Sequence, residues 1–248
     1  MQLIRSKAFD AFVAAWTLII SPSCVVLWLC GTPRHALRAV SQFWARGILW
    51  ALSRIVGLRH VEHGRENIPS GPCIIVANHQ SAWETVALAV MFPAASFVAK
   101  QETARIPIVG WFLKNYPMIM VDRGGGGNAI RQLIVDSRAV LAEGRSVIIF
   151  PEGTRKSISE RVLFKRGAEV LYAELNAPVL PIALNSGMFW TRDGSKCRGT
   201  ITLSYLPPIL PGLSGEEFRQ KAQALLEAER DRLVRESAAQ PALETVAS

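Results

Sequence analysis

The chain has 248 residues, 50% of them apolar and 19% charged, so disorder as its main state is excluded and the chain is long enough to bury a sizeable core. Lys and Arg outnumber Asp and Glu by 28 to 20, but the sequence lacks the dense basic clusters with interleaved aromatic residues that are typical of nucleic-acid binding. Such a basic, apolar chain favours contact with anionic membranes or phosphorylated lipids, and the spacing of its four cysteines indicates neither a disulfide framework nor a zinc site.

The first predicted element is an uncharged stretch over residues 11–30. About 20 apolar residues suffice to cross a bilayer, but Pro22 breaks or kinks a helix near the midpoint of this stretch. We therefore predict a re-entrant helical hairpin that docks on one face of a membrane and keeps its basic flanks on that face. These flanks are Arg5 and Lys7 before the stretch, and Arg34 and Arg38 after it. A single span and a signal peptide are the alternatives, although no convincing cleavage site follows.

Residues 36–58 continue with apolar side chains at helical spacing. Arginines and tryptophans interleaved with these positions suit a helix on the membrane surface, while the same pattern also suits a helix packed on the following domain. We assign residues 1–58 to N-terminal membrane-associated helices.

Beyond Pro72 the sequence predicts short strands that alternate with helices. Six near-continuous apolar runs are predicted as strands: 73–77, 96–99, 118–121, 146–150, 179–184 and 201–205. Runs of this kind are typical of a parallel sheet that is covered on both faces. The best helices are 128–144, capped by Asn128, and about 216–237. We predict an α/β domain over 59–240 with a mostly parallel sheet flanked by helices, followed by a frayed tail at 241–248.

Unusual polar residues follow three of the predicted strands, and functional groups of such sheets gather at the carboxyl ends of strands. One of these groups contains His79 and, five residues later, Glu84. A strand-to-helix turn between them would bring the carboxylate to the imidazole, fixing one ring nitrogen as a donor and leaving the other as a base. The alternative is a lone histidine that caps the next helix.

The second group is Asp122-Arg123, and the third is the turn sequence 150–155, FPEGTR. Gly153 frees the backbone to turn, and Arg155 is suited to hold a phosphate with two hydrogen bonds. The glycine run 124–127 lacks the Lys-Ser/Thr and the glycine spacing of nucleotide sites, so we interpret it as a flexible loop.

Together and in this order, the blocks resemble the glycerolipid acyltransferases, specifically the 1-acyl-sn-glycerol-3-phosphate acyltransferases. The NHxxxxD block of that family resembles 78–84, its strand ending in arginine resembles 117–123, FPEGTR is intact at 150–155, and its apolar strand with proline resembles 179–185. The resemblance covers about residues 60–210, and the N-terminal hairpin resembles the membrane-docking helices of the family. One departure is Glu84, because the acidic residue of the family block is usually aspartate.

The resemblance implies acyl transfer from acyl-CoA or acyl-carrier protein to the sn-2 hydroxyl of lysophosphatidate at the membrane, without metal, cofactor or nucleic acid. His79 would be the base and Glu84 its partner, while Arg123 and Arg155, with Lys100, would bind the acceptor phosphate. Glu152, Gly153 and Thr154 would complete that pocket. The expected location is the bacterial inner membrane, with the active site on the cytoplasmic side. Alternatives are acylation of another lyso-lipid, such as lyso-ornithine lipid, and a non-catalytic phospholipid-binding protein.

Overall fold

The computed structural model describes residues 1–105, 110, 118–122, 124–161 and 163–239. Its centre is a seven-stranded sheet in the order β1-β7-β6-β2-β5-β3-β4. The strands are β1 (Leu58–His63), β2 (Ile74–Ala77), β3 (Ser96–Lys100), β4 (Ile119–Val121), β5 (Val147–Ile149), β6 (Val179–Leu184) and β7 (Gly199–Tyr205). The five strands from β6 to β4 run parallel, whereas β7 runs antiparallel to β6 and pairs in parallel with the edge strand β1. The predicted α/β fold with a mostly parallel sheet is confirmed.

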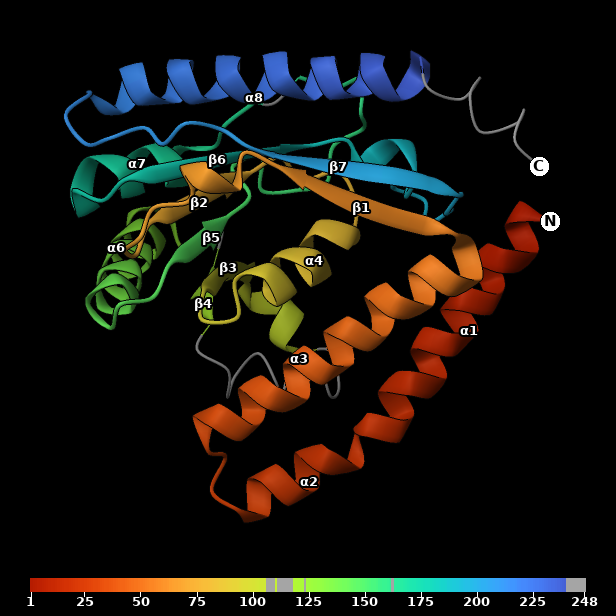
Figure 1. Ribbon diagram of the computed structural model, residues 1–248. Helices are drawn as coiled ribbons and strands as arrows, with labels where there is room; N and C mark the ends of the chain where they lie inside the picture. The colour runs from red at the N-terminus through yellow and green to blue at the C-terminus, as the bar shows by residue number, and fades with distance from the viewer. Residues whose placement is uncertain (106–109, 111–117, 123, 162, 240–248) are drawn as a thin grey trace.

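Helices cover both faces of this sheet (Figure 1). The helices are α1 (Gln2–Ile20), α2 (Pro22–Leu29), α3 (Arg34–Ala51), α4 (Trp83–Met91), α6 (Gly126–Ala142), α7 (Arg166–Leu175) and α8 (Gly215–Ala239). Side chains of α6, α7 and α8 bury one face, and those of α1, α3 and α4 bury the other. On β2, Ile74 and Val76 point to the first of these cores, and Ile75 and Ala77 point to the second. Burial on both faces explains why the strands are uninterrupted apolar runs.

The strand β1 is absent from the predicted set. Four of its six residues are polar, and all of its residues except Leu58 and Glu62 are exposed. Its partner β7 lies about 140 residues later, with Leu58 opposite Gly199. A strand that depends on such a distant partner carries little local signal.

The N-terminal hairpin differs from the prediction in the position of its reversal. Pro22 bends the helix between α1 and α2 but does not reverse it, because Ser21 keeps a right-handed helical conformation. Proline has no N–H to donate to the Leu18 carbonyl, and the Ser21 hydroxyl donates to that carbonyl instead. The chain reverses at Gly31 and Thr32, which both have positive φ. The hairpin is therefore formed by α1 and α2 on one side and α3 on the other (Figure 1).

The inner face of α3 packs against α1, α4 and the sheet, and Leu37, Ile48 and Ala51 are buried there. The alternative in which residues 36–58 form a helix packed on the following domain is therefore confirmed for this inner face. The opposite side of α3 presents Phe43 and Trp50, both more than half exposed. The inner residues of the hairpin thus share one core with the sheet, while its outer residues remain uncovered.

The helix α6 begins at Gly126, two residues before the predicted cap at Asn128, and it ends at Ala142, before Gly144. The glycine run 124–127 therefore forms the turn into α6 and its first residues.

Candidate active site

Polar residues gather where the parallel strands end. Because β2, β5 and β3 are parallel neighbours, the residues that follow them meet at one edge of the sheet. His79 follows β2, Glu152 follows β5, and Lys100 ends β3. The sheet topology thus brings together residues that the sequence separates by up to about 70 positions.

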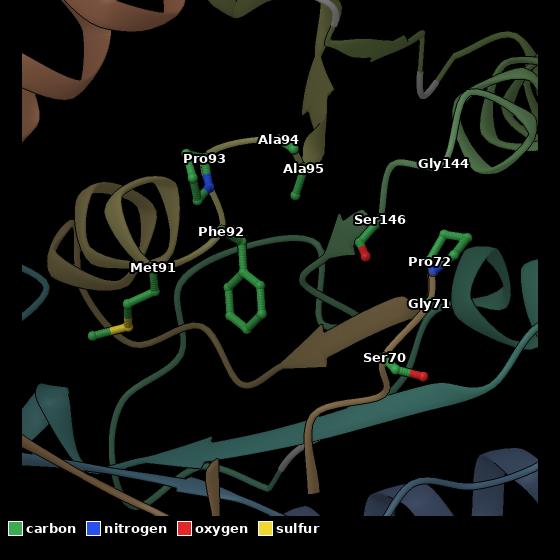
Figure 2. Close-up of a pocket in the computed structure, with 10 residues that line it drawn as sticks. All are labelled: Ser70, Gly71, Pro72, Met91, Phe92, Pro93, Ala94, Ala95, Gly144 and Ser146. Carbon is green, nitrogen blue, oxygen red and sulfur yellow. The ribbon is translucent and has the colours of Figure 1, made fainter. Parts of the chain in front are cut away.

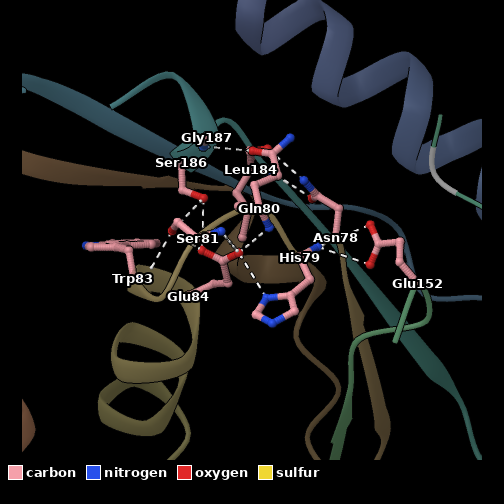
Figure 3. A network of polar contacts seen from close by, with 10 residues as sticks. All are labelled: Asn78, His79, Gln80, Ser81, Trp83, Glu84, Glu152, Leu184, Ser186 and Gly187. Carbon is pink, nitrogen blue, oxygen red and sulfur yellow. Dashed lines mark hydrogen bonds and ion pairs between the residues drawn. The ribbon is translucent and has the colours of Figure 1, made fainter. Parts of the chain in front are cut away.

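His79 and Glu84 are in contact, as the sequence predicts (Figure 3). The Nδ1 atom of His79 lies 3.1 Å from Oε1 of Glu84. The Glu84 side chain is fully buried at the start of α4, whereas 15% of the His79 side chain is exposed. A carboxylate at Nδ1 favours the tautomer with its proton on that nitrogen, which leaves the lone pair on Nε2. The imidazole is therefore arranged as a base that a bound molecule can reach.

The Glu84 carboxylate is held on both oxygens. Oε1 accepts hydrogen bonds from the backbone N–H groups of Gln80 and Ser81, and Oε2 accepts from the Ser81 and Ser186 hydroxyls. Burial by itself raises the pKa of Glu84, but hydrogen bonding and charge from His79, together with the Ser81 donors, outweigh it and leave this pKa below its ordinary value. Glu84 is thus a buried carboxylate that stays ionised.

The FPEGTR turn and Lys156, the residue that follows it, hold the backbone of His79 from both sides. Both carboxylate oxygens of Glu152 accept from the His79 N–H, at 3.2 and 3.1 Å, and the Lys156 N–H donates to the His79 carbonyl at 2.8 Å. The ring of Phe150 stacks on the imidazole, with centroids 4.1 Å apart. Burial raises the pKa of Glu152 to about 8, against the opposing effect of the His79 N–H. Glu152 therefore organises the site through the His79 backbone.

The structure describes some, but not all, of the residues predicted to bind the acceptor phosphate. Lys100, Thr154 and Arg155 lie at the same edge of the sheet with exposed side chains, and Gly153 turns the chain with a φ of +68°. The side chain of Lys165 passes close to Gly153, and its Cδ lies 3.0 Å from where a Cβ of residue 153 would be. Arg123 lies outside the described residues.

Three further residues shape the site and are not among the predicted ones. The Asn78 amide pairs with the backbone N–H and C=O of Leu184, the Gln80 side chain accepts from the Gly187 N–H, and Ser186 binds Glu84. Ser186 follows the carboxyl end of β6, next to β2. The rule that finds His79, polar residues directly after a buried strand, would also have found Ser186.

A separate cavity of about 270 Å³ lies at the opposite edge of the sheet, between Pro72 before β2, Phe92 after α4 and Ser146 before β5 (Figure 2). Its lining residues are small, apolar or hydroxyl-bearing. The cavity is therefore distinct from the site around His79.

Fold and site together are those of an α/β enzyme with its polar residues at the carboxyl edge of a mostly parallel sheet. The sequence model of the family described as Acyltransferase matches residues 59–185. The 1-acyl-sn-glycerol-3-phosphate acyltransferase of Pseudomonas aeruginosa is 36% identical over 229 residues, which are 90% of this chain and 89% of that protein. The chain belongs to the Acyltransferase family, which confirms the resemblance seen in its motifs.

Two further proteins extend this comparison. The 1-acyl-sn-glycerol-3-phosphate acyltransferase beta of Homo sapiens is 27% identical over 214 residues, 84% of this chain and 77% of that protein. The crystal structure of the 1-acyl-sn-glycerophosphate acyltransferase from Thermotoga maritima has a TM-score of 0.74 at 22% identity and covers 94% of this chain and 95% of its own. The fold is thus shared over nearly the whole chain, including the N-terminal helices.

Proposed function

We propose that this acyltransferase moves a fatty acyl group from a thioester to the sn-2 hydroxyl of lysophosphatidate, giving phosphatidate in phospholipid synthesis. The observation that carries the proposal is the pair of His79 and Glu84, with Nδ1 held by a buried carboxylate at 3.1 Å. The printed names of the relatives from Pseudomonas aeruginosa and Homo sapiens support the choice of acceptor. A protein that only binds phospholipid would gain nothing from a carboxylate placed behind the imidazole.

In the proposed step, Nε2 of His79 takes the proton of the sn-2 hydroxyl while the oxygen attacks the thioester carbonyl. Glu84 stabilises the imidazolium that forms. The C–S bond then breaks, the new ester is complete, and the thiolate leaves with the proton that His79 returns. A thiol has a pKa of about 8.5, so its thiolate needs little help in leaving. The thioester supplies an activated acyl group, and the proposed step uses neither a metal nor a cofactor.

The acceptor phosphate would bind at the same edge of the sheet. Lys100 and Arg155 supply exposed cations there, and Arg123 is expected to join them from the segment after β4. Both carboxyl oxygens of Glu152 accept from the His79 N–H, so Glu152 organises the site through that backbone and does not bind the proposed phosphate. Gly153 and Thr154 form the turn that carries Arg155.

The hairpin of α1, α2 and α3 would dock the enzyme on the cytoplasmic face of the inner membrane of a bacterium. Residues 2–29 form a helix long and apolar enough to cross a bilayer, and only 17% of its most apolar window is buried in the protein. Large apolar side chains are exposed along the hairpin: Leu3, Ile4, Leu18, Ile19, Val25, Val26, Trp28, Leu29, Phe43 and Trp50. Docking on one leaflet would place the active site where lysophosphatidate and phosphatidate partition.

A panel of lyso-lipid acceptors, each with acyl-CoA and with acyl-carrier protein as donor, tests the proposal by mass spectrometry of the products. We expect phosphatidate from lysophosphatidate. His79→Ala removes the base and should lower the rate by about 10²–10⁴-fold. Arg155→Ala should lower kcat/KM for lysophosphatidate by at least about tenfold and leave monoacylglycerol, which has no phosphate, little affected. The control is Arg138→Ala, because Arg138 is exposed on α6 and donates to the Glu174 carbonyl.

Three outcomes would contradict the proposal. Preferred turnover of another lyso-lipid, such as lyso-ornithine lipid, would replace the acceptor. Lipid binding without any product would leave a phospholipid-binding protein. Normal turnover by His79→Ala would remove His79 from the mechanism.

A further inference from the structure

A serine outside the family blocks lies behind the proposed catalytic pair. Ser186 begins a short 3-10 helix, Ser186–Met188, directly after Asn185 at the carboxyl end of β6. Its side chain is fully buried, and its hydroxyl donates to Oε2 of Glu84 at 2.9 Å (Figure 3). Ser186 therefore touches the carboxylate on the oxygen that does not face His79.

The position of this hydroxyl is fixed by the backbone around it. The Gly187 N–H donates to the Gln80 side-chain oxygen at 3.0 Å, which ties the short helix to the turn that carries His79. The Trp190 N–H donates to the Ser186 carbonyl at 2.9 Å and closes the following turn. Because β6 also pairs with β2, Ser186 and His79 are held on neighbouring strand ends.

The two oxygens of Glu84 have separate partners. Oε1 serves His79 and two backbone N–H groups, and Oε2 serves the hydroxyls of Ser81 and Ser186. The Ser81 oxygen also accepts from the Trp83 N–H, and its single proton is within reach of both Glu84 and Ser186. Among the residues that the structure describes, the Ser186 hydroxyl is therefore the group that reaches the carboxylate from the β6 side of the site.

We infer that Ser186 is a positioning residue for acyl transfer: its hydroxyl fixes the rotation of the Glu84 carboxylate and so keeps Oε1 against Nδ1 of His79. A glutamate has one more rotatable bond than the aspartate usual in this block, so a second anchor on its far oxygen restricts a freedom that aspartate lacks. The inference rests on the proposed roles of His79 and Glu84.

Ser186→Ala tests this inference in the full-length enzyme. We expect kcat to fall by about tenfold, the size of one hydrogen bond to a charged group, with KM for lysophosphatidate within about twofold. A loosened contact between Glu84 and His79 would also stabilise the imidazolium less, so the acid limb of kcat/KM against pH should move to lower pH. Within the described part of the chain, the charged or titratable groups that act on Glu84 are His79 and, across the His79 backbone, Glu152.

Two controls separate positioning from folding. Ser137→Ala removes a buried hydroxyl on α6 that has no hydrogen-bond partner among the described residues, and it should leave kcat and the pH profile unchanged. Ser186→Cys keeps the volume with a weak donor and should give an intermediate kcat, so the hydroxyl remains testable if Ser186→Ala does not fold. In a Glu84→Asp background the shorter carboxylate should not reach Ser186, and Ser186→Ala should then cost less than in the parent.

The inference is overturned if Ser186→Ala, or Ser186→Cys where the first does not fold, matches Ser137→Ala in kcat and pH profile. An equal loss in the parent and in Glu84→Asp, with an unmoved acid limb, would also overturn it and would assign Ser186 a structural role. His79→Ala in the same assay shows whether the proposed base or only the role of Ser186 is wrong. If His79→Ala is active, the proposed base is wrong; if it is inactive and Ser186→Ala is normal, only the role of Ser186 is lost.

Discussion

At the scale of single residues, two buried glutamates flank His79 and have opposite electrostatic environments. Glu84 touches the imidazole and has its pKa lowered, with hydrogen bonds on both oxygens outweighing its burial. Both oxygens of Glu152 accept from a single backbone N–H, that of His79, and burial raises the pKa of Glu152 to about 8. Such a separation of pKa values assigns different roles to neighbouring carboxylates. Glu84 is suited to support an imidazolium, and Glu152 to hold the backbone.

The raised pKa of Glu152 predicts a pH-dependent contribution to stability. Folding favours the protonated form, so this contribution is complete below about 4.5, the ordinary value, and is lost as the pH rises to about 8. Glu152→Gln keeps an acceptor for the His79 N–H but cannot ionise. Between pH 5 and 8, we expect the unfolding temperature of the parent to fall relative to Glu152→Gln by at least about 2–4 °C, the shift for about 1 kcal/mol in a chain of this size.

Thermal unfolding followed by circular dichroism at several pH values measures this difference. Other titrating groups contribute equally to both proteins and cancel in the comparison. Parallel pH profiles for the parent and Glu152→Gln would show that Glu152 does not have a raised pKa in the folded protein.

The residues of the site differ in how far the sequence reveals them. His79, Glu84 and Glu152 lie within local motifs whose chemistry can be interpreted from spacing alone. The place of Ser186 directly after a buried strand is visible in the sequence, but its partner Glu84 lies 102 positions away and is not. Only the pairing of β6 with β2 gives it a function.

At the scale of elements, the pairing of α1 with α3 depends on a close approach at Gly47. The indole of Trp16 lies where a Cβ on Gly47 would be, at 2.5 Å, and its N–H donates to the Trp44 carbonyl. The Trp44 indole N–H in turn donates to the Thr17 hydroxyl at 3.0 Å. These reciprocal contacts hold the two helices at a fixed separation.

Gly47→Ala should therefore destabilise the protein, although alanine is favoured over glycine in a helix by about 1 kcal/mol. The alanine methyl would push Trp16 from its hydrogen bond and separate α1 from α3. Gly127→Ala, near the start of α6, is the matched control, because no atom lies within 4 Å of its added Cβ. We expect the unfolding temperature to fall for Gly47→Ala and to hold or rise for Gly127→Ala; a rise in both would contradict the close approach.

Local sequence patterns are sufficient to predict some elements of the fold but not others. The strands β2 to β7 are apolar runs whose burial on two faces is visible in the sequence, so their positions are confirmed to within a few residues. The reversal at Gly31 and Thr32 was missed because Pro22 is the stronger local signal. The freed Leu18 carbonyl is satisfied by the Ser21 hydroxyl, and the chain stays helical past the proline.

At the scale of the whole molecule, the hairpin is anchored at its base and uncovered at its tip. Asp10 of α1 pairs with Lys196 at 2.6 Å, and the Lys196 side chain is only 3% exposed over the rings of Phe9 and Trp190. In contrast, α2 and its turn into α3 lie far from the sheet (Figure 1). Removing the hairpin would therefore strip Phe9 from the core, so substitutions at the tip are the cleaner test of docking.

The double variant Val25→Glu with Leu29→Glu places two charges on one side of α2, at positions that are 57% and 71% exposed. Burying one such side chain is worth about 1.5–3 kcal/mol, so we expect binding to vesicles of anionic phospholipid to weaken by at least about 100-fold. Activity on micellar lysophosphatidate should persist, because the tip lies outside the site. Val135→Glu, at a position on α6 with 57% exposure, is the control and should leave vesicle binding unchanged. Co-sedimentation measures both variants, and unaltered sedimentation of the α2 variant would show that the membrane contact lies elsewhere on the protein.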